Sequence, residues 1–298
     1  MKKKIIILGA SGQLGKEFKY NKEFIKSFSC SFYDRNEIDI SKISELENIF
    51  KNECPQFVIN CAAYTDVEKA ESEKDKANSV NNLSVKNLAM LSKKYNFTII
   101  HFSTDYVFSK LYGRPFTETD KKSPINIYGE TKHLGEEQIV KFAEKFLIFR
   151  ISWVYGEWGK NFPKTIISLS RSKKKIDVVS DQIGSPTSTL MIVCLIHRII
   201  SSPNLDKNYG IYNLTPSGQC SWFDISELIH KRLRSKKSCK LETISPVNSD
   251  AFETIAKRPS YSVLDNSLIK KTFNLDIKDW SFYLNHFLDK VDEQYHDK

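Results

Sequence analysis

The chain has 298 residues and a formal net charge of +9, and 40% of it is hydrophobic while 27% is charged. This composition is typical of a globular protein with a sizeable core. No run of about twenty apolar residues occurs, and the N-terminal MKKKIIILGAS turns polar after four aliphatic residues, which excludes a membrane span and a signal-peptide core. We therefore expect a cytoplasmic protein with no membrane partner.

The cysteines and the charge narrow the classes of ligand. Six cysteines are present without C-x-x-C spacing, which argues against a zinc site or a disulfide framework. The basic runs, such as Arg171 to Lys175, are short and lack a nucleic-acid-binding motif. We interpret them as solvated surface and expect no nucleic-acid partner, whereas a basic balance suits a small anionic ligand such as a nucleotide diphosphate.

Short apolar runs alternate with amphipathic segments in the first half of the chain. The runs cover residues 3–9, 28–34, 56–60, 97–103 and 146–152, and helical patterns such as Ile43 to Phe50 and Asn81 to Lys94 lie between them. This alternation predicts an α/β fold of the Rossmann type, with a doubly wound parallel sheet. Two later runs, 175–180 and 210–215, are expected to extend the same sheet.

The regular alternation fades after about residue 153, where prolines and polar loops become frequent. We therefore predict a dinucleotide-binding domain over residues 1–153 and a smaller, mainly substrate-binding part over residues 154–298. No clear linker separates the two, so they are expected to be interleaved.

A glycine-rich turn, GASGQLG, follows the first predicted strand and opens a helix. Gly9 permits a tight turn, Gly12 lets the backbone approach a pyrophosphate, and Gly15 lets the helix pack close to the strand. The N-terminus of the helix offers free N–H donors to the phosphates. In this context of strand, turn and helix, the motif predicts a dinucleotide site.

The end of the second predicted strand bears on which dinucleotide binds. Asp34 lies about twenty residues past the glycines, where an acid favours a free ribose 2′-hydroxyl and hence NADH. Arg35, next to it, favours the 2′-phosphate of NADPH or stacks on adenine. The two residues leave the cofactor open between NADPH and NADH. Asp39 and Ile40 are candidates to border the adenine, and Asp39 is equally a candidate helix cap.

Two Y-x-x-x-K segments occur, Tyr106 to Lys110 and Tyr128 to Lys132. At this spacing a tyrosine and a lysine share one face of a helix. The first segment is followed by glycine and proline, which favours a loop. The second is followed by an acid-rich stretch with apolar residues at helical spacing. Tyr128 and Lys132 are therefore the candidate acid/base pair.

The glycine turn gives this pair a chemical task. A tyrosine that protonates a carbonyl oxygen during hydride transfer works best when its pKa falls from about 10 towards neutrality. Lys132 and an oxidised nicotinamide ring would both favour the phenolate of Tyr128. Thr104 follows the fourth predicted strand at the carboxyl edge of the sheet, where its hydroxyl can hydrogen-bond the reacting oxygen and tune Tyr128.

The motifs of the chain, taken in order, resemble those of the dTDP-4-dehydrorhamnose reductases, which are extended short-chain dehydrogenases/reductases. The stretches concerned are GASGQLG (9–15), NCAAYTDVEKAE (60–71), STDYVF (103–108), PINIYGETK (124–132), RISWVYG (150–156), NFPKTII (161–167), DQIGSPT (181–187), GIYNL followed by SWFDIS (210–226) and KRPSYSVLD (257–265). The resemblance implies reduction of the 4-keto group of dTDP-4-dehydro-L-rhamnose by NAD(P)H to give dTDP-L-rhamnose for cell-envelope polysaccharide.

The resemblance also implies roles for single residues. Tyr128 would donate the proton, Thr104 would assist it, and Lys132 would orient the nicotinamide ribose and lower the pKa of the tyrosine. The implied cofactor positions are Ser11, Gly12, Gln13, Leu14, Ala62, Ala63, Tyr64, Thr65 and Phe102, besides Tyr128 and Lys132. The implied substrate positions are Thr104, Asp105, Tyr106, Trp153 and Asn161, and we choose Arg258 for the diphosphate. The indole of Trp153 would stack on the hexose, and the alternative is an ordinary core aromatic.

Two positions depart from the family pattern. The usual Asp-Gly after STDYVF is Ser109 and Lys110 here, which affects the expected loop shape. Some members form a dimer through magnesium held by glutamates, and Leu190 stands where we look for such a glutamate. We therefore expect no metal, and a homodimer remains open.

Three other functions are compatible with parts of the pattern. Nucleotide-sugar dehydratases share the tyrosine and lysine but typically carry Asp-Glu after the threonine, whereas Asp105 is followed by Tyr106 here. A related ketoreductase that makes the talose epimer differs only in how the sugar is seated. The regulatory subunit of methionine adenosyltransferase resembles this family without acting as an enzyme, and the complete set of Thr104, Tyr128 and Lys132 argues against that role.

Overall fold

The computed structural model describes residues 2–109 and 113–296. A six-stranded parallel sheet with the order β10-β5-β4-β3-β1-β2 forms its main part. The strands are β1 (Lys4–Leu8), β2 (Ser29–Tyr33), β3 (Phe57–Asn60), β4 (Thr98–Thr104), β5 (Phe146–Ile151) and β10 (Gly210–Asn213). β3 and β4 are buried along their whole length because helices cover both faces of the sheet, which explains their continuous apolar runs.

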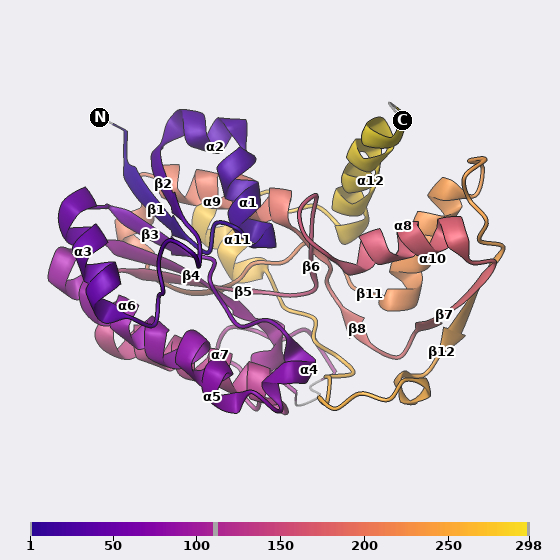
Figure 1. Ribbon diagram of the computed structural model, residues 1–298, viewed down its shortest axis with the longest axis horizontal. Coiled ribbons are helices and arrows are strands. Elements are labelled where there is room, and N and C mark those ends of the chain that lie inside the picture. Colours follow the sequence, from indigo (N-terminus) through magenta and orange to yellow (C-terminus); the bar gives the residue numbers. More distant parts are fainter. Residues whose placement is uncertain (1, 110–112, 297–298) are drawn as a thin grey trace.

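Helices cover the sheet in two layers (Figure 1). One layer holds α1 (Gln13–Tyr20), α2 (Lys22–Ser27), α9 (Thr189–Ser201) and α11 (Ser267–Phe273), and the other holds α3 (Ile43–Glu53), α6 (Ser84–Tyr95) and α7 (Ile127–Phe142). Each layer has its own apolar core, with Phe18 and Ile196 in the first and Leu46 and Leu88 in the second. The doubly wound α/β fold predicted from the alternating pattern is therefore confirmed.

The remaining elements form a smaller part beside the carboxyl edge of the sheet (Figure 1). It contains α8 (Phe162–Ser172), α10 (Trp222–Leu233) and α12 (Trp280–His296), with β7 (Lys175–Val179) and β12 (Thr243–Val247). Its core is built from Ile166, Val178, Ile225 and Leu288. Short pieces complete the described chain: α4 (Val67–Ala70), α5 (Lys74–Asn78), β6 (Val154–Tyr155), β8 (Ile183–Gly184), β9 (Thr187–Ser188), β11 (Cys220–Ser221), a π-helical turn η1 (Ser79–Leu83) and the 3₁₀ turns η2 (Asp105–Val107), η3 (Leu205–Lys207) and η4 (Ser249–Ala251).

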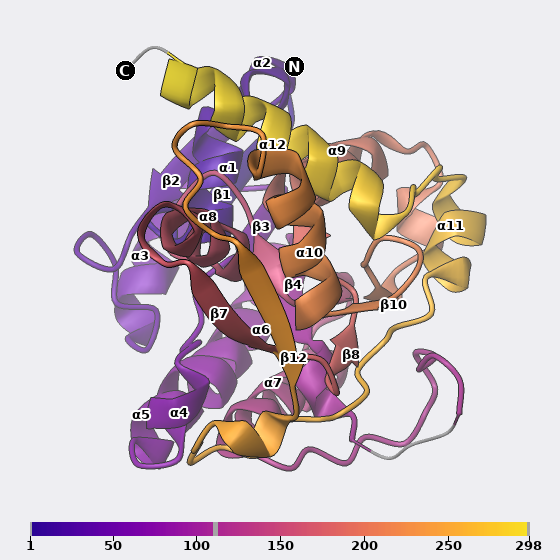
Figure 2. The same ribbon diagram turned by 90° about the vertical axis from the view of Figure 1, so that its right-hand side faces the viewer.

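One of the two expected extensions of the sheet is wrong. The run over 210–215 supplies β10, which pairs with β5 in the central sheet. The run over 175–180 supplies β7, which instead pairs in parallel with β12 in a separate two-stranded sheet (Figure 2). The physical reason is visible in its burial pattern: Lys175 and Asp177 are exposed on one face, so the strand cannot be covered by helices on both sides. The division at residue 153 stays a prediction.

The strand order places the functional loops together. The order reverses between β1 and β3, and in open α/β sheets a ligand binds at the carboxyl ends of the strands where this reversal occurs. The turn that starts at Gly9 follows β1, and the segment from Cys61 to Thr65 follows β3. Gly9 N and Ala10 N both donate to Tyr33 O, at 2.9 and 3.0 Å, and so hold the glycine turn against the end of β2.

A buried ion pair joins α7 to the sheet. Arg150 on β5 donates from Nε and Nη2 to the two carboxylate oxygens of Glu136, at 2.9 and 2.7 Å. The two side chains are 0% and 3% exposed. Arg150 also donates to Glu118 O at 3.0 Å and lies over the ring of Phe108. Since a buried charge without its partner is costly, this pair fixes the helix that carries Tyr128 relative to β5.

Removing one partner of this pair should destabilise the protein strongly. We predict that Arg150→Met lowers the free energy of unfolding by about 3–5 kcal/mol, because Glu136 is left buried and unpaired. The double variant Arg150→Met/Glu136→Leu should recover part of that loss. Urea unfolding measures both. Lys93→Met, which breaks the exposed pair with Glu144, serves as control and should change little. An Arg150→Met variant as stable as this control would contradict the prediction.

Candidate active site

The helix α7 presents the predicted acid/base pair. It begins after Asn126, whose side-chain oxygen accepts a hydrogen bond from Gly129 N at 2.8 Å and caps the helix. Tyr128 and Lys132 follow within the first turns and lie four residues apart, on one face. A Cβ on Gly129 would come within 2.3 Å of Tyr106 O, so the helix packs directly against the turn that follows β4.

Thr104 lies at the carboxyl end of β4 and meets Tyr128. Its hydroxyl donates to Asp105 Oδ1 at 3.0 Å and accepts from Tyr106 N at 3.2 Å. A hydrogen bond also joins Thr104 to Tyr128. This contact lowers the pKa of the Tyr128 phenol, in opposition to the effect of burial.

The first Y-x-x-x-K segment begins in a 3₁₀ turn and not in an α-helix. Tyr106 belongs to the 3₁₀ turn η2, and its ring centre lies 5.8 Å from that of Tyr128 in an edge-on arrangement. Lys110 lies outside the described residues. Tyr106 therefore flanks the candidate proton donor and does not begin a helix.

Burial sets the protonation state of Tyr128. It raises the pKa of the phenol to about 12, and the hydrogen bond from the Thr104 side opposes this only in part. The sequence-based expectation of a lowered pKa is therefore not met in the cofactor-free protein. The reason is the position of Lys132, which is turned away from the phenol and into the interior.

The amine of Lys132 is buried below the helix. The side chain is 2% exposed, and its Nζ donates to Phe102 O at 2.6 Å and lies 3.2 Å from Nε2 of His101. Burial lowers the pKa of Lys132 to about 8, against an opposing effect of Glu136. Phe102, a predicted cofactor position, acts here through its carbonyl, while its ring belongs to the core.

The glycine turn has the shape that a dinucleotide requires. Gly9 has a φ of +78°, and a Cβ there would come within 2.6 Å of Ala62 N. A Cβ on Gly15 would come within 2.2 Å of Gly9 O, so this residue allows helix and strand to pack. A Cβ on Gly12 would meet only Gly9 O, at 3.3 Å, and would otherwise project into open space beside the N-terminus of α1. The donor set of this helix end fits a pyrophosphate.

A cavity adjoins this turn and collects most of the predicted cofactor residues. Ten of them line it: Gly9, Ser11, Gly12, Asp34, Arg35, Asp39, Ile40, Ala62, Ala63 and Tyr64. The sequence analysis missed eight other lining residues: Leu8, Tyr33, Ile38, Ser41, Cys61, Lys76, Ser79 and Val80. Ser79 and Val80 begin the π-helical turn η1, and a single-turn π-helix often marks a functional site but has no clear sequence signal.

The other predicted cofactor residues lie around this cavity without lining it. Leu14 is 9% exposed and belongs to the core of the first helix layer. Thr65 is exposed in the loop after β3. Gln13 is held by the smaller part, since its Nε2 donates to Val154 O at 3.2 Å and its Oε1 accepts from Asn161 Nδ2 at 2.7 Å.

The residues that bear on cofactor choice both face the cavity. Asp34 Oδ1 accepts from Asn36 N at 2.8 Å, which fixes the carboxylate at the cavity wall beside Arg35. Asp39 Oδ1 accepts from Ser41 N at 3.0 Å and from Ser41 Oγ at 2.7 Å, and these bonds lower the pKa of Asp39. Asp39 thus stabilises a turn while it lines the cavity. The helix α3 itself begins after Lys42.

Trp153 packs one face of its ring against a second tryptophan. Its indole stacks on Trp222, with ring centres 3.6 Å apart and planes within 10°. Gly184 also lies against the indole, where a Cβ would come within 2.5 Å of Cε2. Trp153 remains half-buried beside these contacts. The expected stacking of Trp153 on a hexose therefore stays a prediction.

Arg258 connects the two parts of the molecule next to the candidate pair. Its Nη2 lies 2.5 Å from Glu68 Oε1, and Glu68 Oε2 accepts from Ile255 N at 2.8 Å. Arg258 also hydrogen-bonds the side chain of Tyr106. The guanidinium is 27% exposed. Glu68 thus holds Arg258, the residue predicted to bind the diphosphate, in place. The sequence analysis did not single out Glu68.

A second cavity, of about 670 Å³, begins at Arg258 and extends over the smaller part. Its walls include Phe162, Ile166, Trp222 and Gln182. Asn161, a predicted substrate residue, does not line it, because its side chain caps α8 at Lys164 N and donates to Gln13. Trp222 and Gln182 are joined by a hydrogen bond of 3.2 Å from the indole nitrogen. Both lie within the family-like stretches quoted above, which is the signal that could have found them.

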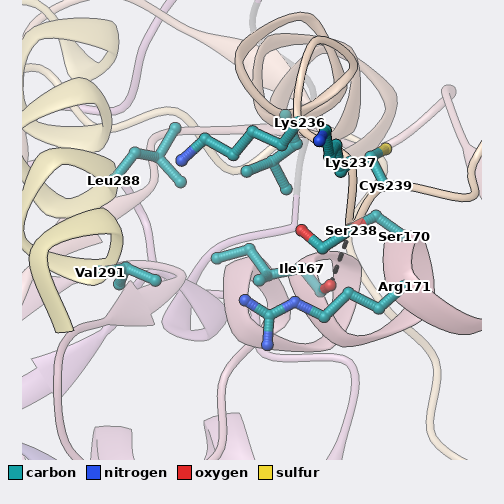
Figure 3. A pocket seen from close by; sticks show the side chains of 10 residues that line it. Ile167, Ser170, Arg171, Lys236, Lys237, Ser238, Cys239, Leu288 and Val291 are labelled. Atoms are coloured by element: carbon teal, nitrogen blue, oxygen red, sulfur yellow. Dashed lines mark hydrogen bonds between the residues drawn. The ribbon is translucent and has the colours of Figure 1, made fainter. Parts of the chain in front are cut away.

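Another cavity, of about 480 Å³, lies between α8, α10 and α12 (Figure 3). Its lining combines the apolar side chains of Ile167, Leu288 and Val291 with the basic Arg171 and Lys237. It shares no lining residue with the two cavities described above. We do not count it as part of the candidate active site.

Residues 2–109 and 113–296, which the structure describes, contain neither a metal-binding cluster nor a membrane-spanning helix. No group of three or more His, Cys, Asp or Glu side chains is placed to hold a metal ion there. In the same part of the chain, no helix is long and apolar enough to cross a membrane.

The Tyr-Lys pair on a helix, the threonine at the end of β4 and the glycine turn at the switch point define the class of extended short-chain dehydrogenases/reductases. Comparison with known proteins is more specific. Residues 2–293 match the family model described as "RmlD substrate binding domain". The chain belongs to this family, that of the dTDP-4-dehydrorhamnose reductases.

Individual relatives are similar along most of their length. The chain is 36% identical over 239 residues to dTDP-4-dehydrorhamnose reductase of Escherichia coli K12, with 80% of each chain covered. It is 32% identical to the enzyme of that name from Burkholderia thailandensis, over 94% of this chain and 96% of the relative. A crystal structure of the Bacillus anthracis dTDP-4-dehydrorhamnose reductase in complex with NADP superposes with a TM-score of 0.91 at 33% identity, covering 97% of this chain and 100% of that chain.

The glycine geometry predicts that two substitutions have different effects. Gly12 has a φ of −70°, so Gly12→Ala should fold normally but weaken NADPH binding by at least about tenfold, since the methyl group occupies the phosphate approach. Gly15→Ala should lower the melting temperature as well, because its methyl group meets backbone atoms. Fluorescence titration with NADPH and thermal melting measure the two effects. Wild-type affinity in Gly12→Ala would contradict the placement of the phosphates.

The buried carboxyl of Asp105 predicts a pH-dependent stability. Burial raises its pKa to about 7, so the folded protein binds a proton that the unfolded chain has lost, and stability falls as the pH rises from about 4 to 7. Asp105→Asn removes this penalty. We expect the stability advantage of the variant over wild type to grow by about 2–3 kcal/mol from pH 5 to pH 8. Urea unfolding at several pH values measures this, and a pH-independent difference would contradict the assignment.

Proposed function

We propose that the chain reduces the 4-keto group of dTDP-4-dehydro-L-rhamnose with NADPH or NADH and forms dTDP-L-rhamnose. The observation that carries the proposal is the contact of Tyr128 with Thr104, one helical turn from the buried amine of Lys132, in a chain of this family. Relatives of the chain bear the name of this activity, and the similar Bacillus anthracis structure holds NADP.

The residues at the switch point fit the dinucleotide. The free N–H groups at the start of α1 would hold the pyrophosphate, and the cavity beside Asp34 and Arg35 would take the adenosine part. The bound cofactor would supply the hydride to C4 of the sugar. Since the carboxylate of Asp34 and the guanidinium of Arg35 face the same cavity, both NADH and NADPH belong in the assay.

Tyr128 supplies the proton that the reduction needs. With its pKa raised to about 12 by burial, the phenol is protonated at any physiological pH and is ready to donate to the oxygen on C4. The Thr104 side chain hydrogen-bonds this phenol and holds its pKa below the value that burial alone would give.

The smaller part would hold the nucleotide portion of the substrate. Arg258 lies beside Tyr106 and Tyr128 at one end of the second cavity, which suits a diphosphate next to the reacting sugar. The apolar and aromatic walls beyond it, including Phe162 and Ile166, suit a thymidine. Trp153 supports the Trp222 wall of this cavity through its stack.

The proposal is tested by oxidation of NADH and of NADPH, followed at 340 nm, with dTDP-4-dehydro-L-rhamnose as substrate and NMR identification of the product. We predict that Tyr128→Phe lowers kcat at least about a hundredfold, because the proton donor is lost, while the KM for the sugar changes little. Tyr20→Phe, which removes the phenol hydroxyl from an exposed side chain outside the site, is the matched control and should keep most of the activity. Failure of wild-type protein to turn over the sugar, although it binds cofactor, would refute the proposal. The talose epimer as product would correct its stereochemistry.

A further inference from the structure

His101 lies at the centre of a hydrogen-bonded chain below the candidate site. It is on β4, is 0% exposed, and has a partner at each ring nitrogen. Asn60 Nδ2 lies 3.2 Å from His101 Nδ1, and Lys132 Nζ lies 3.2 Å from His101 Nε2. Neither the acid/base roles described above nor the cofactor cavity accounts for this histidine.

The orientation of the Asn60 amide is fixed by the backbone. Asn60 Oδ1 accepts from Ala62 N at 3.1 Å, so the amide oxygen points to the segment that follows β3. The amide nitrogen therefore points to His101 Nδ1. A rotated amide would place two donors, its NH₂ group and the Ala62 N–H, against each other. Asn60 is 2% exposed, and water cannot take over either contact.

The tautomer of His101 follows from this orientation. Burial lowers the pKa of the imidazole well below its usual range, so the ring is neutral. A neutral imidazole carries one proton and one lone pair. Because Asn60 donates to Nδ1, the lone pair is on Nδ1 and the proton is on Nε2. The Nε2–H then points at the amine of Lys132.

An Nε2–H that points at Nζ requires an acceptor there. A neutral amine has one lone pair and can accept this bond while it donates to Phe102 O, whereas an ammonium group has no lone pair. Burial already lowers the pKa of Lys132 to about 8, and the donor at His101 favours the neutral form further. The opposing charge, Glu136 on α7, is paired with Arg150 on β5, and Asp105 and Tyr128 lie on the side of Thr104.

We propose that His101 is a positioning residue that holds Lys132 as a neutral amine in the cofactor-free protein, and that Lys132 gains its proton when the dinucleotide binds. The chain runs from Ala62 N through Asn60 and His101 to Lys132, and Ala62 itself lines the cofactor cavity. Binding in that cavity and the charge of the catalytic lysine are thereby coupled. The catalytic consequence rests on the proposed function, whereas the tautomer and the charge do not.

The proposal predicts a specific response to pH. Above the pKa of Lys132, the proton of His101 is on Nε2. As the pH falls through that pKa, Lys132 becomes an ammonium group that donates a hydrogen bond to Nε2, which must then carry the lone pair. The ring proton then moves to Nδ1 and the bond from Asn60 is lost. The ¹⁵N chemical shifts of the ring nitrogens in histidine-labelled protein report this directly. Comparison with His101→Gln assigns the signals among the six histidines.

The free protein gives the first result. We expect the Nε2–H tautomer at pH 8.5, a shift towards Nδ1–H at lower pH, and no such shift in Lys132→Met. An Nδ1–H or doubly protonated ring at pH 8.5 would overturn the proposal. These signals do not depend on turnover, so a chain that fails to reduce the sugar still tests the inference.

Calorimetry of NADPH binding in two buffers of different ionisation enthalpy gives the second result. At pH 8.5 we expect uptake of up to about one proton per site by the wild type. In Asn60→Asp the new carboxylate accepts from an Nδ1–H, frees Nε2 for the ammonium, and should cut the uptake at least about twofold. The control is His197→Gln, because His197 lies on α9, where its ring contacts Ser27 and none of the described residues of the site. This variant should match wild type. No proton uptake by the wild type would refute the coupling.

Discussion

The burial of one amine sets the electrostatics of this site. Lys132 emerges from α7 into the space between the helix and β4, where a backbone carbonyl and a histidine ring are its partners. Water would stabilise an ammonium far better than these partners do, so the site tends to keep the lysine uncharged until something compensates the charge. The helix is held over this point by the Asn126 cap and by the Arg150–Glu136 pair.

The other titratable groups of the site are consistent with a resting state of low charge. Tyr128 keeps its proton, and the pKa of Asp105 lies near 7 because burial raises it. Thr104 lies between them and contacts both side chains. Such an arrangement avoids isolated buried charges. The charge of a bound dinucleotide and of a sugar diphosphate would shift the pKa values of Lys132, Tyr128 and Asp105 together.

The sequence was informative where a local pattern has a local consequence. Continuous apolar runs predicted the central strands, and the glycine turn and the Tyr128–Lys132 spacing predicted where the sheet and helix would place their side chains. The sequence was less informative where a segment far along the chain determines the surroundings of a residue or the placement of a strand. Trp222 covers Trp153 from a helix some seventy residues further along the chain, and Lys175 and Asp177 distinguish β7 from a central strand only through their exposure. The role of His101 depends on contacts from three elements, which no spacing in the sequence reveals.

The central claim is our proposal that Lys132 is neutral and Tyr128 protonated in the cofactor-free protein, and that cofactor binding charges the lysine and lowers the pKa of the tyrosine. The most direct test is an ultraviolet titration of the Tyr128 phenolate, taken as the difference between wild type and Tyr128→Phe, without and with saturating NADP⁺. We expect a pKa of about 12 in the free protein and a fall of several units towards neutrality in the complex. An unchanged pKa in the complex, or one that is already near neutral in the free protein, would contradict the account.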